Sequence, residues 1–108
     1  MKNVNAETCK SIIKNHPFVV IKFGAEWCEP CKSVTRYLKE LAPTYPQIEF
    51  LELDVDSDLA FAVEMEVRAI PSIFFAINGE FLKDNKGGNE KVTDIVSTKN
   101  IINRFHSQ

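Results

Sequence analysis

The sequence predicts an α/β fold with a mixed central sheet and helices on both of its faces. Two apolar, β-branched segments, residues 18–23 and 48–55, flank a segment with helical spacing, which indicates a right-handed βαβ unit with parallel strands. A third apolar segment, residues 72–77, is followed by a turn-rich stretch, which is typical of an antiparallel neighbour. The chain has 108 residues, of which 44% are apolar, so we expect a single domain over residues 1–108.

The first half of the chain is expected to alternate helix and strand. Asn5 can cap a first helix that runs to about Asn15, and Pro17 stops it. The strand over residues 18–23 follows and ends at Gly24. A second helix is expected over residues 31–42, because apolar side chains share one of its faces: Val34, Leu38 and Leu41.

The segment between the second and third strands is expected to hold a short helix. Asp56 or Ser57 can cap it, and its apolar residues are Leu59, Ala62 and Val63. After the third strand, residues 78–90 are polar and hold three glycines, so they predict a long connection with a small hairpin around Phe81 and Leu82.

The C-terminal segment allows two interpretations. The β-branched residues 91–96 favour a last strand, after which Ser97 or Thr98 caps a final helix. One continuous helix over residues 90–106 is the alternative, which the same β-branched residues weakly disfavour.

Composition and charge exclude several classes of function. The net charge of −2 argues against a nucleic-acid partner, and no apolar run approaches the ~20 residues of a membrane span. The first five residues carry no apolar signal core, so we expect no secretion by that route. Three cysteines are too few for a disulfide-scaffolded mini-protein and indicate a reducing, cytoplasmic location.

The sequence Trp27-Cys28-Glu29-Pro30-Cys31 carries the chemistry. At a helix start, backbone N–H groups and the helix dipole favour a thiolate on Cys28, while Cys31 lies one turn further and stays shielded. Pro30 suits the first helical turn. This asymmetry suits thiol–disulfide exchange, in which Cys28 attacks a substrate disulfide and Cys31 resolves the mixed disulfide.

Metal binding and a purely structural disulfide are the other interpretations of the pair. A zinc site needs two further ligands, and the chain offers only Cys9, His16 and His106, so we expect no metal. A disulfide across so short a loop constrains little chain entropy. Cys9 shares a helix face with apolar residues and is expected in the core.

These residues resemble the thioredoxin family over about the whole chain. The matching segments are Phe23, Ala25-Glu26-Trp27-Cys28, Pro30-Cys31-Lys32, Leu53-Asp54-Val55-Asp56 and Val67-Arg68-Ala69-Ile70-Pro71-Ser72.

The resemblance implies a thioredoxin fold and a protein dithiol–disulfide oxidoreductase. It implies that Pro71 is cis, that Ile70 and Pro71 shape a groove for an extended substrate peptide, and that Trp27 covers the site. It further implies a monomer that acts on disulfide-containing proteins. The protein would need no cofactor beyond the Cys28–Cys31 disulfide and would be recharged by a thioredoxin reductase that uses NADPH.

Two charged positions depart from the family. The family usually has glycine where this chain has Glu29, and a carboxylate beside Cys28 disfavours its thiolate and makes the pair a stronger reductant. Alternatively, Glu29 points into water and has little effect on the thiol. The family also buries an aspartate at the position of Lys22 and tends to place a lysine at that of Glu52. We expect a swapped ion pair, with a proton relay through Glu52 or through Lys22 as a neutral amine. Alternatively, Lys22 snorkels to the surface and Glu52 is an ordinary exposed residue.

The third departure is length. The family joins its last two strands by a tight turn, whereas here about ten extra residues are expected between Asn78-Gly79 and Lys91. They form either a partner-contact loop or neutral surface. Ser97 is expected where the family prefers a glycine that lines the substrate groove.

Two functions follow from these observations. The first is a thioredoxin-type oxidoreductase with Cys28 as nucleophile and Cys31 as resolving thiol. The alternative is a binding or adaptor module that keeps the fold with slow or specialised redox chemistry.

Overall fold

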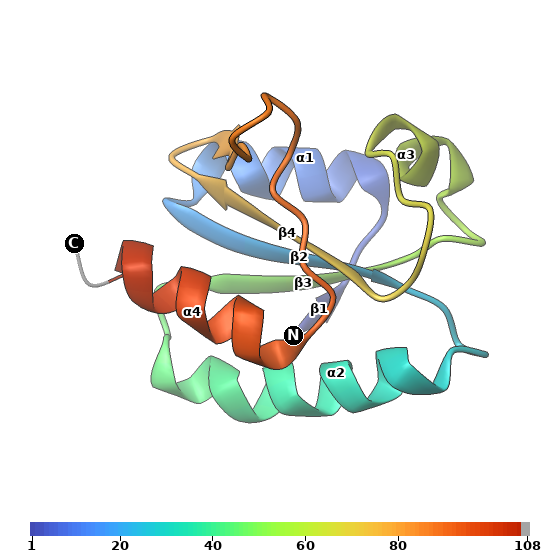
Figure 1. Cartoon of the computed structure of the whole chain (residues 1–108), viewed down its shortest axis with the longest axis horizontal. Coiled ribbons are helices and arrows are strands. Elements are labelled where there is room, and N and C mark those ends of the chain that lie inside the picture. The colour runs from blue at the N-terminus through green and yellow to red at the C-terminus, as the bar shows by residue number, and fades with distance from the viewer. Residues whose placement is uncertain (107–108) are drawn as a thin grey trace.

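The computed structural model, which describes residues 1–106, has five strands in one mixed sheet with the order β1–β3–β2–β4–β5 (Figure 1). β3 runs parallel to β1 and to β2, whereas β4 runs antiparallel to β2 and to β5. This confirms the predicted fold class and its central βαβ unit, and β4 has an antiparallel neighbour, although that neighbour is β5 and not the predicted strand. The strands are β1 (Lys2–Asn3), β2 (Phe18–Gly24), β3 (Glu49–Asp54), β4 (Ser72–Ile77) and β5 (Glu80–Phe81).

Helices cover both faces of this sheet, as Figure 1 shows. α1 (Ala6–Asn15) and α3 (Leu59–Glu64) pack on one face, and α2 (Glu29–Leu41) and α4 (Ile95–His106) pack on the other. A 3₁₀ turn, η1 (Ala42–Thr44), continues α2. Within residues 1–106, no helix combines the length and the apolar character that crossing a membrane requires.

The central strand β2 is buried along its whole length, and its side chains alternate between the two cores. Val19, Ile21 and Phe23 belong to the core under α1 and α3, whereas Phe18 and Val20 belong to the core under α2 and α4. The same alternation directs Lys22 to the α2 side. A lysine therefore occupies a core position near the carboxyl end of β2.

The start of α1 agrees with the prediction, but the start of α3 does not. The Asn5 side chain accepts a hydrogen bond from the Thr8 N–H at 2.8 Å. Asp58, rather than Asp56 or Ser57, is the N-cap of α3, and its side chain makes no cap bond there. The Asp58 carboxylate instead accepts from the Ala6 N–H at 3.2 Å, which ties α3 to α1.

The predicted last strand over residues 91–96 is wrong. On the side of β4 away from β2, the neighbouring strand is β5. Asn78 and Gly79 join β4 to β5, and their φ angles of 53° and 87° suit a type I′ turn. Of the predicted strand, Val92 alone pairs with the sheet, through two backbone hydrogen bonds to Ile73.

The additional length therefore lies after β5, in residues 82–94, and it is ordered by its own hydrogen bonds. Leu82 accepts from the Glu90 N–H, and Asp84 accepts from two backbone N–H groups of the same loop. These bonds close residues 82–90 into a compact hairpin. The hairpin expected around Phe81 and Leu82 is thus present, with its position shifted along the chain.

The final helix starts at Ile95, so neither Ser97 nor Thr98 caps it, and the alternative helix over residues 90–106 is also wrong. The Asp94 carboxylate accepts from the Ser97 N–H at 2.6 Å, in the geometry of an N-cap. Hydrogen bonds from the backbone and side chain of Ser97 hold the pKa of Asp94 below its usual value. Ser97 itself lies in the first turn of α4.

Replacing Asp94 tests this boundary. Asp94→Ala removes the acceptor at the helix start, so we expect a lower urea midpoint, whereas Asp94→Asn keeps a capping acceptor and restores most of the stability. Equilibrium unfolding followed by circular dichroism measures both variants. Equal midpoints for Asp94→Ala and the native protein would contradict a cap at Asp94.

Candidate active site

The Cys pair lies at the junction between the end of β2 and the start of α2. Cys28 is the N-cap residue of α2, and its sulfur accepts from the Cys31 N–H at 3.2 Å. Pro30 stands in the first helical turn, where its missing N–H removes no helical hydrogen bond. The helix therefore starts two residues earlier than the sequence predicts, and its N-terminal dipole is directed at Cys28.

A disulfide joins Cys28 and Cys31, whose Cα atoms lie 5.2 Å apart. Both residues are buried: Cys28 is 5% exposed and Cys31 is 1% exposed. They pack in a small apolar cluster with Ala25, Val55 and Ile70. Both cysteines are buried, but Cys28 is the more accessible of the two, which is the order that the sequence predicts.

Trp27 and the Ile70-Pro71 segment flank the disulfide. Trp27 is 68% exposed, and its indole N–H donates to the Asp56 carboxylate at 2.8 Å. The Ile70–Pro71 peptide bond is cis, as the resemblance implies. The Ile70 carbonyl oxygen lies 4.0 Å from the Cys28 sulfur, so this segment borders the disulfide directly.

The Glu29 side chain is 82% exposed to solvent, as the second alternative for this residue expects. Its carboxylate pairs with the Lys32 ammonium at 3.2 Å, and both side chains are largely exposed. An exposed charge already paired within its own helix exerts a weak field on a neighbouring thiol. The repulsion between Glu29 and Cys28 is therefore weaker than the sequence alone indicates.

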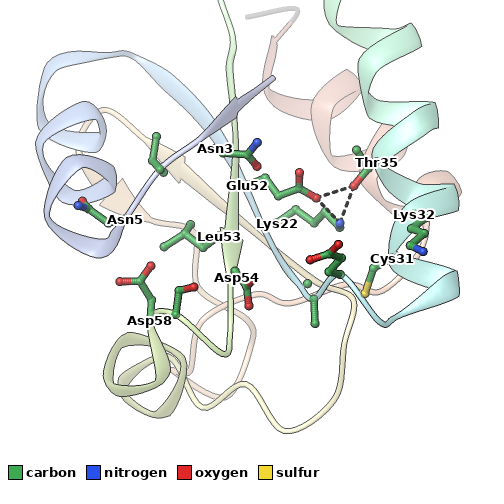
Figure 2. Close-up of a pocket in the computed structure, with 15 residues that line it drawn as sticks. Asn3, Asn5, Lys22, Cys31, Lys32, Thr35, Glu52, Leu53, Asp54 and Asp58 are labelled. Carbon is green, nitrogen blue, oxygen red and sulfur yellow. Dashed lines mark hydrogen bonds and ion pairs between the residues drawn. The ribbon is translucent and has the colours of Figure 1, made fainter.

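Lys22 and Glu52 form the ion pair that the sequence predicts. They face each other in the register of β2 and β3, and their charged atoms lie 2.5 Å apart. Thr35 of α2 completes a triangle: its hydroxyl accepts from Lys22 at 2.5 Å and donates to Glu52 at 2.6 Å (Figure 2). The Lys22 side chain is 2% exposed, which excludes a snorkelling lysine, and that of Glu52 is 23% exposed.

The electrostatics of the pair keep Glu52 ionised. Burial raises the pKa of the Glu52 carboxyl, but hydrogen bonds from Lys22 and Thr35, together with the Lys22 charge, outweigh burial and hold the pKa below its usual value. Within residues 1–106, every buried side-chain nitrogen and oxygen has a hydrogen-bond partner. The buried ammonium is accordingly compensated by one carboxylate and one hydroxyl.

A cleft of about 700 Å³ connects this pair to Cys31 and to solvent. It runs from β1 and the residues after it, past the end of β3, to the first turns of α2, and Figure 2 shows its lining. Gly24 lines it between Lys22 and Cys31. A Cβ at Gly24 would lie 2.8 Å from Lys22 Nζ and 3.3 Å from Cys31 Sγ, so a side chain at this position would have to displace the Lys22 ammonium.

Sequence reasoning missed Thr35 and Gly24 as parts of the site, although both have a signal. Thr35 follows Cys31 by four residues and so shares its helix face. Gly24 follows Lys22 by two residues and so shares its strand face. The sequence alone does not show that this face of the helix and this face of the strand meet at one point.

The remaining cysteine and the histidines lie outside this site. Cys9 is fully buried in α1, and burial is the main cause that raises the pKa of its thiol to about 12. His16 Nδ1 lies 3.0 Å from the Ile12 carbonyl oxygen, and the His106 ring packs on Tyr45. No group of three or more metal-ligating side chains occurs in the part of the chain that the structure describes.

A thioredoxin-fold domain with a redox-type cysteine pair at a helix N-terminus is the class that this fold and site define. The thioredoxin family model matches residues 1–100, and the chain belongs to the thioredoxin family. It is 38% identical over 77 residues to thioredoxin H4-1 of Oryza sativa subsp. japonica, a match that covers 71% of this chain. It is also 38% identical over 80 residues to thioredoxin-1 of Schizosaccharomyces pombe, with 74% of this chain and 78% of that protein covered.

Solved structures agree with this assignment over nearly the whole chain. The oxidised form of mitochondrial thioredoxin 3 from Saccharomyces cerevisiae superposes with a TM-score of 0.84 at 27% identity, covering 97% of this chain and 95% of that one. The thioredoxin of Fasciola hepatica gives a TM-score of 0.83 at 25% identity, covering 96% and 98%. The matched part of this chain spans 59% of the length of the rice protein and 50% of that of thioredoxin-2 from Pyricularia oryzae.

The ion pair makes the stability of the fold depend on pH. The pKa of Glu52 is lower in the folded state than its reference value of 4.5, so the unfolded state binds the proton more tightly. The resulting stabilisation is complete above about pH 4.5 and is lost as the pH falls through the folded-state pKa.

We therefore expect the native protein to lose more unfolding free energy between about pH 6 and about pH 3 than the double variant Lys22→Met/Glu52→Gln. The double variant replaces the ion pair without leaving a single charge buried, and every other carboxylate is the same. Urea unfolding across this range measures the difference. Identical pH dependence in the two proteins would show that the pair contributes no pH-linked stability.

Proposed function

We propose that the protein is a thiol–disulfide oxidoreductase that reduces disulfide bonds in other proteins through Cys28 and Cys31. The observation that carries this proposal is the disulfide that caps α2, with an exposed Trp27 and a cis Pro71 beside it. Membership of the thioredoxin family supports the same chemistry.

The reaction begins with the reduced pair. The Cys28 thiolate is favoured by the dipole of α2 and by the Cys31 N–H that is directed at its sulfur. It attacks one sulfur of the substrate disulfide, a new S–S bond forms, and the other substrate sulfur leaves as a thiolate that takes up a proton. The product of this step is a mixed disulfide between Cys28 and the substrate.

Cys31 completes the reaction. Its thiol gives up a proton, its sulfur attacks Cys28 Sγ, and the second substrate sulfur leaves as a thiolate. The protein is left with the Cys28–Cys31 disulfide, and two electrons have moved to the substrate. Cys28 is the more exposed of the two cysteines, at 5% against 1% for Cys31, which supports Cys28 as the residue that meets the substrate first.

The surface around the disulfide suits an extended peptide. Trp27 offers an exposed aromatic face, and the backbone of Ile70, held by the cis bond to Pro71, lies next to Cys28. Backbone hydrogen bonds between Ile70 and a substrate strand would hold many sequences in one orientation. Glu29 and Lys32 would then border the groove as a paired, solvated rim.

Further parts of the proposal follow from the family. The protein works as a monomer in a reducing, cytoplasmic setting, has no cofactor of its own, and is recharged by a thioredoxin reductase that draws on NADPH. One structural neighbour comes from a study of the thiol-resolving mechanism of a yeast mitochondrial 1-Cys peroxiredoxin through the glutathione and thioredoxin systems. Peroxiredoxins are therefore candidate substrates beside protein disulfides in general.

The test is reduction of insulin disulfides with dithiothreitol as the electron source. We expect turnover with the native chain, and no turnover above the dithiothreitol background with Cys28→Ser or Cys31→Ser, because each variant lacks one step. Cys31→Ser should also accumulate a mixed disulfide on Cys28, which mass spectrometry detects.

Cys9→Ser is the matched control. It removes a thiol of the same chain that lies in the core away from the pair, so it should keep the native turnover. Equal background rates for the native chain and both pair variants would favour the binding or adaptor module instead.

A further inference from the structure

We propose that Lys22 is a positioning residue for the resolving step, whose fixed ammonium favours the ionised sulfur of Cys31. This inference deepens the proposed function and rests on it. It assigns a buried positive charge to the second half of the reaction, in which Cys31 must become a thiolate inside the protein.

The ammonium is held in one place by three elements of the fold. β2 supplies Lys22, β3 supplies Glu52 directly opposite, and α2 supplies Thr35. The hydrogen bonds to Thr35 and Glu52 are both 2.5 Å, and the side chain is 2% exposed. A buried cation with two short, fixed contacts cannot swing away when a nearby group ionises, so it acts as a preorganised charge.

Gly24 reveals how close that charge is to Cys31. The point at which a Gly24 Cβ would stand is 2.8 Å from Lys22 Nζ and 3.3 Å from Cys31 Sγ. The two atoms are therefore separated by at most 6.1 Å, the sum of those distances. Only a residue without a side chain leaves this short path between ammonium and sulfur open.

Apolar and charged groups both surround Cys31. The sulfur packs with Ala25, Val55 and Ile70, which are apolar and keep the local dielectric low. Five other charged side chains line the cleft, and Figure 2 shows the Lys22 ammonium on the Cys31 side of the Glu52 carboxylate. These five are Glu26, Lys32, Glu52, Asp54 and Asp58.

The same contacts argue against Glu52 as the base that deprotonates Cys31. Its Oε2 already accepts from Lys22 and from Thr35, and these bonds lower the pKa of its carboxyl. The carboxylate of an acid with a lowered pKa is a weak base, and it therefore accepts a thiol proton poorly. The proton of Cys31 instead passes to water in the cleft, and the thiolate that remains is stabilised by Lys22. The sulfur then attacks Cys28 Sγ, and the substrate sulfur leaves with the electron pair of the broken bond.

The test follows the resolving step alone. The reduced protein reacts with 5,5′-dithiobis(2-nitrobenzoate), which forms a mixed disulfide on Cys28, and release of the second thionitrobenzoate reports the attack by Cys31. Stopped-flow absorbance gives the rate of that release as a function of pH. The midpoint of the profile reports the ionisation of Cys31, and the plateau at high pH reports the attack itself.

Lys22→Met should raise the midpoint by about one pH unit, slow release near neutral pH about tenfold, and leave the plateau close to native. Attraction between the Lys22 ammonium and the Cys31 thiolate across roughly 6 Å, at an effective dielectric of about 20, corresponds to about two pH units in the midpoint. The Glu52 carboxylate offsets part of this attraction. Lys22→Met/Glu52→Gln, which leaves no charge unpaired, should raise the midpoint as well and covers the case in which the single variant fails to fold. Lys22→Arg keeps the charge and should restore most of the native profile.

Two controls separate charge from structure and from proton transfer. Lys2→Met also removes a lysine paired with a β3 glutamate, Glu49, and should leave the profile unchanged. Glu52→Gln removes the carboxylate but keeps an amide oxygen that can accept from the Lys22 ammonium, and the folded variant should not slow release at any pH. An unchanged midpoint in Lys22→Met, or a slower release at all pH values in Glu52→Gln, would overturn the inference.

The outcome is independent of protein substrates. A shifted midpoint with no insulin reduction would uphold the role of Lys22 and reject the proposed function. Native insulin reduction with an unshifted midpoint would do the reverse.

Discussion

A lysine on the central strand of the sheet requires a counter-charge, and the parallel register of β2 with β3 supplies one. Lys22 stands directly opposite Glu52, and Thr35 of α2 bonds to both. Leaving either charge alone at this depth would cost several kcal/mol. The triangle therefore fixes β2, β3 and α2 relative to one another, and these are the elements that carry the site.

The position of the Cys pair follows from this arrangement. Cys28 caps α2, and Cys31 lies one turn along the helix, on the face that also holds Thr35. Gly24 then closes the distance, because its lack of a side chain lets the Cys31 sulfur approach the Lys22 ammonium. Stability and chemistry thus depend on the same few contacts, since the pair that holds the strands together also sets the charge beside the resolving sulfur.

The sequence predicted the parts of the molecule that have a strong local signal. The three long strands are continuous apolar segments, and α1 and α2 have helical spacing. The Lys22–Glu52 pair was expected from the resemblance to the thioredoxin family, which places an acid and a base at these positions in the opposite order. The predicted last strand is wrong because that prediction rested on the β-branched residues 91–96 alone. The Asp94 cap and the compact hairpin before it determine the structure of this segment.

β1 was missed because two exposed residues have no recognisable pattern, and its pairing with β3 is a tertiary contact. The sequence left two alternatives open for Glu29, because its placement depends on which neighbour its carboxylate reaches.

The central claim is that the charge next to Cys31 is a cation, and reversing the pair tests it most directly. The variant Lys22→Glu/Glu52→Lys keeps an ion pair between β2 and β3 but places a carboxylate on the strand nearer the sulfur. Its reduction potential can be measured by equilibration with glutathione buffers. The account predicts a folded protein with a more reducing potential than the native one, because the reduced, partly ionised pair loses a favourable charge. A potential equal to the native value, or a more oxidising one, would contradict it.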